Sequence, residues 1–197
     1  GVMYDIPVMG TMAHSWIQSY GTEREAFESF IETYGEASIL LIDTYDTVEG
    51  AKKAKEVAQT RGVKIKGVRL DSGDLVSLSK QVKAVVGDLG IYITSGLDEY
   101  KIDHFLQEGG IATGFGVGSN LVTIQDIPVA EIVYKLVQVE ENGKKIPSMK
   151  FSDGKRTYPG EKSIKRLVKN GKYQKDILAL KEEELEGEEQ LINIYSN

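Results

Sequence analysis

A short stretch of the sequence, residues 66–75, places one cation and two carboxylates beside a glycine-containing turn. Arg69, Asp71 and Asp74 lie within six residues, where an apolar strand is expected to end. Arginine can hold a phosphate through two parallel hydrogen bonds. Aspartate can accept hydrogen bonds from sugar hydroxyls or hold magnesium through its water ligands, and Asp71 is the better placed for this role. The stretch therefore predicts a site for a ligand that carries phosphate, sugar hydroxyls and a bound metal.

The elements that would position this stretch repeat along the first two thirds of the chain. Five apolar runs each end in a polar turn, and helical spacing of apolar residues follows four of them. Successive strand–helix units form a parallel sheet, which is either a barrel or an open doubly wound sheet. A barrel brings all the polar strand ends to one mouth, whereas an open sheet gathers fewer of them. We therefore predict the α/β class, as an incomplete (β/α) barrel over residues 1–128. The expected strands are 6–9, 38–42, 66–70, 91–94 and 112–114, and the expected helices are 24–34, 48–61, 75–86 and 99–108.

Beyond residue 128 the pattern changes to antiparallel strands. Two strand pairs are expected, each closed by an Asn-Gly turn, which is a strong hairpin signal. A last short strand is expected after an acidic stretch. We predict a returning antiparallel segment over residues 129–197 that packs beside the barrel. Its expected elements are 129–139 with 146–151, 163–168 with 173–180, the acidic stretch 181–189 and the strand 191–195.

Composition excludes several other classes. The formal net charge of −6 does not favour a nucleic-acid surface, and the absence of cysteine excludes disulfides and thiolate metal sites. No apolar run approaches the roughly 18 residues that a membrane span requires. We expect a cytoplasmic protein without nucleic-acid or membrane partners. Because the chain begins with Gly1 and enters an apolar run almost at once, we also expect that an amino-terminal portion is missing.

His14 and a glycine-rich loop at 115–120 are further candidates for chemistry. A lone histidine is more often structural, but His14 follows an expected strand end, and Asp43 at the next strand end could hold one tautomer of its imidazole. Gly116 and Gly118 would let backbone N–H groups approach a phosphate, although a tight turn is an equally good interpretation. Other polar residues have simpler explanations. Asp46, Asp74 and Asp98 are expected first as helix caps, His104 as a surface residue, and Lys155, Arg156 and Lys162 as a solvated turn or an electrostatic guard of the mouth.

Five motifs, taken together, resemble the nicotinate phosphoribosyltransferase family in their order and spacing. The resemblance covers roughly residues 3–185 and corresponds to the second half of that enzyme. It implies that nicotinate and phosphoribosyl pyrophosphate react to nicotinate mononucleotide and pyrophosphate, with Mg²⁺ as cofactor. It also implies ATP as a co-substrate that transiently phosphorylates a histidine. The motifs are Gly10-Thr-Met-Ala-His14-Ser, Leu41-Ile-Asp43-Thr-Tyr-Asp46-Thr, Gly67-Val-Arg69-Leu-Asp71-Ser-Gly-Asp74, Phe115-Gly-Val-Gly118-Ser-Asn-Leu and Lys155-Arg-Thr-Tyr-Pro-Gly160-Glu-Lys.

By position in these motifs, the resemblance assigns a role to individual residues. His14 corresponds to the phosphohistidine, Asp43 to its carboxylate partner, and Asp71 to a catalytic residue at the phosphoribosyl pyrophosphate. The family also builds its active site at the interface of a homodimer, and an amino-terminal domain binds the pyridine ring. We therefore expect no turnover from this chain alone. The substrate-binding residues implied by the resemblance are Thr11, Arg69, Gly73, Ser95, Gly96, Gly116, Gly118 and Ser119.

Three alternatives stay open at this point. A nicotinamide-specific relative would share most of these motifs, and a comparison of the two bases as substrates separates it. A non-catalytic phosphoribosyl-binding subunit would keep the phosphate loops without the chemistry. The length of the native reading frame distinguishes such a subunit from the enzyme. A barrel isomerase or aldolase would need a base or a Schiff-base lysine at a strand end, and no lysine lies clearly in such a place.

Overall fold

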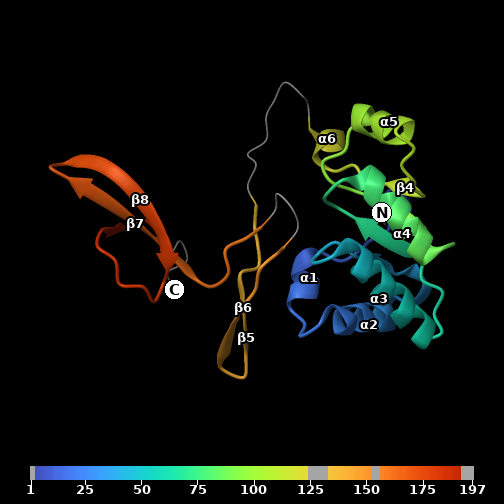
Figure 1. The fold of residues 1–197 in the computed structure, drawn as a ribbon, viewed down its shortest axis with the longest axis horizontal. Coiled ribbons are helices and arrows are strands. Elements are labelled where there is room, and N and C mark those ends of the chain that lie inside the picture. Colours follow the sequence, from blue (N-terminus) through green and yellow to red (C-terminus); the bar gives the residue numbers. More distant parts are fainter. Residues whose placement is uncertain (1–2, 124–132, 152–155, 192–197) are drawn as a thin grey trace. The chain divides into compact units, whose positions relative to one another are not determined.

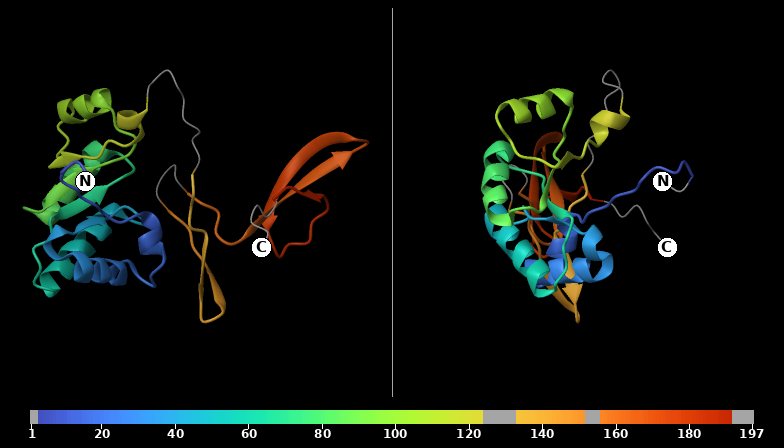
Figure 2. Two further views of the ribbon diagram at one scale, coloured as in Figure 1. Left: turned by 180° about the vertical axis from the view of Figure 1, so that it is seen from behind. Right: turned by 90° about the vertical axis from the view of Figure 1, so that its right-hand side faces the viewer.

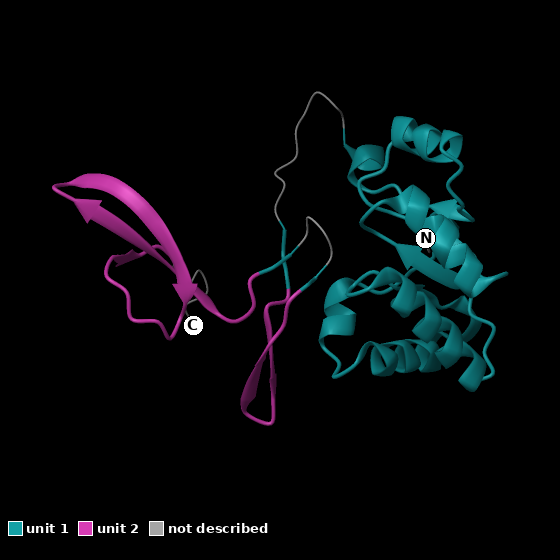
Figure 3. Cartoon of the chain, in the orientation of Figure 1, with its two compact units in different colours: residues 1–135, 150–157 teal, residues 136–149, 158–197 magenta. Residues whose placement is uncertain are grey.

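The computed structural model describes residues 3–123, 133–151 and 156–191 (Figure 1). Contacts divide the chain into two compact units, shown in Figure 3. Unit 1 comprises residues 1–135 and 150–157, and unit 2 comprises residues 136–149 and 158–197. This division differs from the expected boundary at 128/129, because the later segment 150–157 belongs to unit 1.

Unit 1 is built on a parallel sheet of four strands. They are β1 (Ile39–Leu41), β2 (Gly67–Leu70), β3 (Gly90–Ile93) and β4 (Gly114–Phe115), in the spatial order β1-β2-β3-β4. A doubly wound sheet reverses its strand order at a switch point, and this sheet does not. Right-handed crossovers in such an order place the connecting helices on one face of the sheet (Figure 2). The predicted α/β class is confirmed, and the sequential order is that of a barrel portion.

The helices of unit 1 begin and end close to the predicted bounds. The three predicted caps are confirmed, because Asp46, Asp74 and Asp98 each accept a hydrogen bond from a backbone N–H three residues later. None of the described helices combines the length and the apolar character that crossing a bilayer requires. The long helices are α2 (Glu23–Tyr34), α3 (Thr47–Thr60), α4 (Leu75–Val86) and α5 (Glu99–Gln107), and the short ones are α1 (His14–Gln18), η1 (Gly35–Ala37) and α6 (Ser119–Val122).

The strands of unit 1 appear as apolar runs in the sequence because most of their residues are buried in its core. All three residues of β1 are buried, β2 is buried except at Arg69, and β3 alternates between half-buried and buried residues. Val68 and Leu70 are fully buried in the core, while Arg69 and its register neighbour Tyr92 on β3 lie on the other face and are half-buried. The alternation of the strand therefore turns Arg69 away from the apolar core.

The strand predicted at residues 6–9 does not form. Residues 6–13 have no regular secondary structure, and the ladder pairs β1 with β2 alone among the described strands. The segment nevertheless contacts both ends of β1. Thr11 Oγ1 donates a hydrogen bond to the Ile39 carbonyl (2.7 Å) at one end, and His14 contacts Thr44 just beyond the other end. Val8 and Met9 are 81% and 61% exposed. Without backbone pairing or burial, the segment lacks what stabilises a strand, although it still carries His14 to the carboxyl end of β1.

Unit 2 consists of antiparallel strands, as predicted. β5 (Gln138–Glu141) pairs with β6 (Lys144–Pro147), and β7 (Lys162–Lys169) pairs with β8 (Lys172–Leu180) and with β9 (Glu188–Glu189). Both Asn-Gly turns have positive φ at each of their two residues, which is the backbone of a tight hairpin turn. β9 lies within the stretch that was expected to be acidic and solvated. The strand predicted at 191–195 lies outside the described residues except for residue 191, which is not in a strand.

Candidate active site at the strand ends

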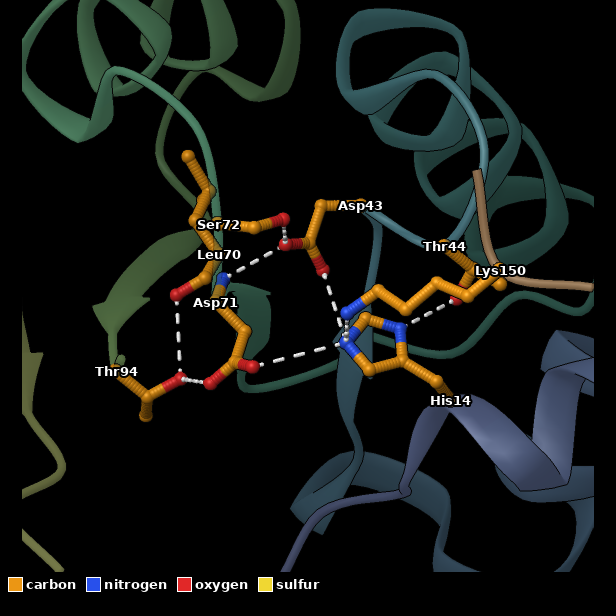
Figure 4. A network of polar contacts seen from close by, with 8 residues as sticks. All are labelled: His14, Asp43, Thr44, Leu70, Asp71, Ser72, Thr94 and Lys150. Atoms are coloured by element: carbon orange, nitrogen blue, oxygen red, sulfur yellow. Dashed lines mark hydrogen bonds and ion pairs between the residues drawn. The ribbon is translucent and has the colours of Figure 1, made fainter. Parts of the chain in front are cut away.

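The carboxyl ends of β1, β2 and β3 gather polar side chains from separate parts of the sequence (Figure 4). A histidine comes from the first residue of α1, and a lysine comes from the late segment that belongs to unit 1. Parallel strands in a barrel-type order bring their ends to one edge, so residues distant in sequence meet there. We call this group the strand-end cluster: His14, Asp43, Thr44, Asp71, Thr94 and Lys150.

The imidazole of His14 lies at the centre of the strand-end cluster. Its Nδ1 is hydrogen-bonded to Thr44 Oγ1 (3.0 Å), and its Nε2 lies 2.5 Å from Lys150 Nζ. Two carboxylates are slightly farther from Nε2, Asp71 Oδ2 at 3.7 Å and Asp43 Oδ1 at 3.9 Å. Asp43, expected as the partner that holds the imidazole, is thus at ion-pair distance, while the hydroxyl of Thr44 makes the hydrogen bond.

Asp43 connects β1 to the turn after β2. It is 2% exposed, and its Oδ2 accepts hydrogen bonds from the backbone N–H of Asp71 (3.0 Å) and from the hydroxyl of Ser72. Charge-assisted hydrogen bonds of this kind stabilise a buried carboxylate. Asp43 therefore fixes the position from which Asp71 projects.

Asp71 connects the histidine to β3. Its Oδ1 accepts a hydrogen bond from Thr94 Oγ1 (2.5 Å), while its Oδ2 faces His14. The side chain of Asp71 is 25% exposed, compared with 1% for Asp43. Asp71 is thus the carboxylate of the pair that a ligand can reach more easily.

Arg69 is a cation held close to the two carboxylates. Burial lowers the pKa of its guanidinium, and the negative charges of Asp71 and Asp43 oppose that shift. Its Nε is buried and has no hydrogen-bond partner among the described residues. A buried N–H without a partner is costly, and a phosphate oxygen would satisfy it. Arg69 is therefore suited to binding an anionic ligand.

Three loops after β2, β3 and β4 supply the predicted glycines. Gly73 and Gly96 have φ of +83° and +58°, and Ser95 has φ of +102°, a strained conformation for a residue with a side chain. A Cβ on Gly116 would lie 2.7 Å from the Thr94 methyl, so a side chain at position 116 would require Thr94 to shift. Asn120 Nδ2 donates to the Leu97 carbonyl (2.9 Å) and joins the loop after β4 to the loop after β3. Gly118 and Ser119 lie at the start of α6, in that connected pair of loops.

Not every predicted site residue joins the strand-end cluster. Thr11 binds the carbonyl of Ile39, at the opposite end of β1 from His14. Lys162 donates to the carbonyls of its own turn, Tyr158 and Gly160, and His104 is exposed on α5 as predicted. Arg156 is exposed, and residue 155 lies outside the described residues.

Sequence reasoning missed Lys150, Thr44 and Thr94. Lys150 is only 2% exposed, although lysine is almost never fully buried unless it is paired. Its place between Met149 and Phe151, inside a run expected to be a strand, was the one available signal. No sequence spacing links it to His14, because 136 positions separate the two residues.

The carboxylates of the strand-end cluster suit a magnesium ion that is coordinated mainly by the phosphates of a bound substrate and by water. Among the described residues, no group of three His, Asp or Glu side chains forms a metal site. Magnesium is usually bound by one or two carboxylates together with water and substrate phosphates. Asp71, with Asp43 behind it, offers that arrangement, so the residues present fit the ion.

Together, the parallel sheet, the glycine loops and the strand-end cluster define an α/β protein with a polar, charged cluster at its strand ends. The profile of the nicotinate phosphoribosyltransferase (NAPRTase) family matches residues 2–177, and the chain belongs to this family. It is 41% identical over 201 residues to nicotinate phosphoribosyltransferase pncB2 of Mycobacterium tuberculosis (strain H37Rv), covering 98% of this chain and 42% of the relative. It is 36% identical over 203 residues to nicotinate phosphoribosyltransferase of Bacillus subtilis (strain 168), covering 97% of this chain and 41% of that protein. The chain therefore spans less than half the length of these relatives.

The fold is also that of solved members of the family. The nicotinate phosphoribosyltransferase from Porphyromonas gingivalis superimposes with a TM-score of 0.66 at 24% sequence identity, covering 79% of this chain and 45% of that chain. The corresponding protein from Vibrio cholerae gives a TM-score of 0.59 at 22% identity, over 77% of this chain and 40% of that chain. At these identities, the similarity supports the fold.

Proposed function

We propose that this chain is the phosphoribosyl-binding and histidine-bearing part of a nicotinate phosphoribosyltransferase. In the proposed reaction, nicotinate displaces pyrophosphate from phosphoribosyl pyrophosphate to give nicotinate mononucleotide. The observation that carries the proposal is the convergence of His14, Asp71 and Lys150 at the strand ends of a chain that belongs to this family. The names of the relatives favour nicotinate over nicotinamide as the base.

The residues of the chain have distinct tasks in this proposal. Arg69 binds phosphate oxygens and neutralises the charge that develops on the leaving pyrophosphate. The loops at Gly96 and Gly116 hold the 5′-phosphate through backbone N–H groups, so that the ribose is fixed relative to Asp71. Magnesium, held by Asp71 through water, supplies further neutralisation of the pyrophosphate when it is bound.

His14 couples ATP to the reaction in this proposal. One ring nitrogen attacks the γ-phosphorus of ATP, a P–N bond forms, and the P–O bond to the leaving ADP breaks. Water later cleaves the P–N bond and releases inorganic phosphate. The ammonium group of Lys150, beside the ring, offsets the negative charge that the phosphoryl group brings to two nearby carboxylates.

The remaining parts of the proposal follow from the family. We place the enzyme in the cytoplasm as a homodimer whose active site lies at the interface. The groups that bind the pyridine ring lie outside the chain described above. The coverage of 42% and 41% of two curated relatives is compatible with this arrangement.

Phosphate transfer from γ-labelled ATP tests the proposal in the native protein, expressed from its complete reading frame. We expect an acid-labile, base-stable label in the wild type and in His104→Ala, whose histidine is exposed on α5, and no label in His14→Ala. Turnover with nicotinate should clearly exceed turnover with nicotinamide. A folded wild type without label, or a label that persists in His14→Ala, would refute the coupling through His14. Turnover with nicotinamide alone would establish the nicotinamide-specific alternative.

A further inference from the structure

Thr94 contacts two parts of the site that belong to different strands. Its hydroxyl reaches Asp71 after β2, and its methyl group lies against Gly116 after β4. We infer that Thr94 is a positioning residue of the proposed transfer reaction. Its hydroxyl orients Asp71 toward His14, and its methyl supports the loop that takes the 5′-phosphate. This inference rests on the proposed function.

The hydroxyl of Thr94 has a single proton to donate and two acceptors within reach. Its Oγ1 lies 2.5 Å from Asp71 Oδ1 and 3.2 Å from the Leu70 carbonyl, which already accepts from the backbone N–H of Thr94 (2.9 Å). The charged and nearer carboxylate oxygen is the stronger acceptor. The hydroxyl therefore donates to Asp71.

This hydrogen bond determines which way the Asp71 carboxylate faces. Rotation about the last side-chain bond of aspartate is broad, so a carboxylate needs external partners to hold its plane. With Oδ1 bound to Thr94, Oδ2 faces His14 Nε2 at 3.7 Å (Figure 4). Thr94 thus acts on the histidine through Asp71 and without touching it.

The methyl group of Thr94 has a separate role at the phosphate loop. A Cβ on Gly116 would lie 2.7 Å from Thr94 Cγ2, so the methyl fills the space beside that glycine. The backbone N–H of Gly116 donates to the carbonyl of Ile93 (2.8 Å), the residue just before Thr94. The loop that leads to Gly118 and Ser119 is therefore held against the carboxyl end of β3 by these two contacts.

Two conservative substitutions separate these roles. Thr94→Val keeps the branched shape and removes the hydroxyl, whereas Thr94→Ser keeps the hydroxyl and removes the methyl. A merely structural residue would lower stability in both variants without separating kcat from the KM for phosphoribosyl pyrophosphate. A positioning residue of the kind we infer separates them.

We expect opposite kinetic results from the two variants of the native protein. In Thr94→Val, kcat and the rate of His14 labelling should fall about 10- to 100-fold, the loss typical of a hydrogen bond to a charged group, with KM for phosphoribosyl pyrophosphate within about threefold. In Thr94→Ser, kcat should stay within about threefold while that KM rises several-fold. Wild-type kcat and labelling in Thr94→Val would refute the role of the hydroxyl, and an unchanged KM in Thr94→Ser would refute the role of the methyl.

Thr113→Val is the matched control. The hydroxyl of Thr113 accepts a hydrogen bond from the backbone N–H of Ile91 (3.0 Å), at the other end of β3, so its loss should leave kcat and KM unchanged. Calorimetric binding of phosphoribosyl pyrophosphate separates the possible failures. If the wild type neither turns over nor takes up label, the proposed function and the role of the hydroxyl are refuted together. The role of the methyl is then still decided by whether Thr94→Ser, and not Thr94→Val, weakens binding.

Discussion

At the scale of single residues, the site is distinguished by charges that are buried together. Lys150 and Asp43 are each 2% exposed, and both lie within 4 Å of the same imidazole nitrogen. Removing ammonium and carboxylate groups from water costs several kcal/mol per ion, which their mutual attraction offsets only in part. A hydrophobic cluster would stabilise the fold at lower cost, so the arrangement favours a functional role.

Lys150→Met tests this role in the native protein. The change keeps an unbranched side chain that is one atom shorter, and it removes the cation that faces the phosphoryl group in the proposed reaction. We expect the rate of His14 labelling by ATP to fall at least tenfold, the lower end of the cost of losing a charged hydrogen bond. The measurement is the initial rate of label incorporation at saturating ATP.

Lys55→Met is the control for that variant. Lys55 is a half-buried lysine on α3 whose Nζ donates to the Val85 carbonyl (2.8 Å), away from the strand-end cluster. It should label at the wild-type rate. Equal labelling by Lys150→Met and the wild type would contradict the role of Lys150.

At the scale of elements, the site depends on how closely α3 approaches β1. Gly50 lies on the buried face of α3, and a Cβ there would lie 2.2 Å from the backbone carbonyl oxygen of Ile42. Real Cβ contacts are longer than this, so a side chain at position 50 would push the helix away. Asp43 and Thr44 follow Ile42 directly, so this contact sets the position of two members of the strand-end cluster.

Gly50→Ala should destabilise unit 1 although alanine favours helices. Helix propensity contributes about 1 kcal/mol in favour of alanine, whereas overpacking against a backbone typically costs about 1–3 kcal/mol or more. We expect a net loss in the free energy of unfolding and a lower midpoint in urea. Gly10→Ala, where no atom lies within 4 Å of the added Cβ, should stay within about 0.5 kcal/mol of the wild type. A gain in stability from Gly50→Ala would show that α3 can move without cost.

At the scale of the whole molecule, the two units are stabilised differently. Nearly all of the buried apolar residues belong to unit 1, with Ala179 the exception in the described part of unit 2. The sheet of β7, β8 and β9 instead carries ion pairs, among them Arg166 with Asp176 and Lys165 with Glu189. These ion pairs should therefore make the stability of unit 2 depend on pH.

Glu189 allows the sign of this response to be worked out. Hydrogen bonds from the Leu191 backbone and from Lys165 lower the pKa of the Glu189 carboxyl from 4.5 to about 2. A group whose pKa is depressed in the folded state stabilises that state above its unfolded pKa. The contribution of Glu189 should therefore be lost as the pH falls from about 4.5 to about 2.

Amide hydrogen exchange of β7 and β9 checks this expectation. Protection in the wild type should fall over that pH window, and Glu189→Gln should show a flatter profile because its side chain does not titrate. An equally steep loss of protection in Glu189→Gln would assign the acid sensitivity to other carboxyl groups.

Features that depend on residues close together in the chain could be predicted from the sequence. The apolar run at 38–42 predicted a strand that is buried on both faces, and the buried strand β1 lies within it. The caps of α3, α4 and α5 and the two Asn-Gly hairpin turns were also predictable, because their hydrogen bonds and backbone angles are local. Among the candidate residues, His14, Asp43 and Asp71 were identified from their places after expected strands, and the structure brings these three together although the strand before His14 does not form.

The groups that surround His14 are brought there by contacts between residues far apart in the chain. The segment at 6–9 has the composition of a strand but no backbone partner, and pairing is a property of the sheet as a whole. Lys150 contacts His14 across 136 positions, and Thr94 contacts Asp71 and Gly116 from an adjacent strand. Such contacts depend on strand order and on the return of a late segment to unit 1. Local propensity contains no information about either, because the free energy that selects them comes from packing the whole unit.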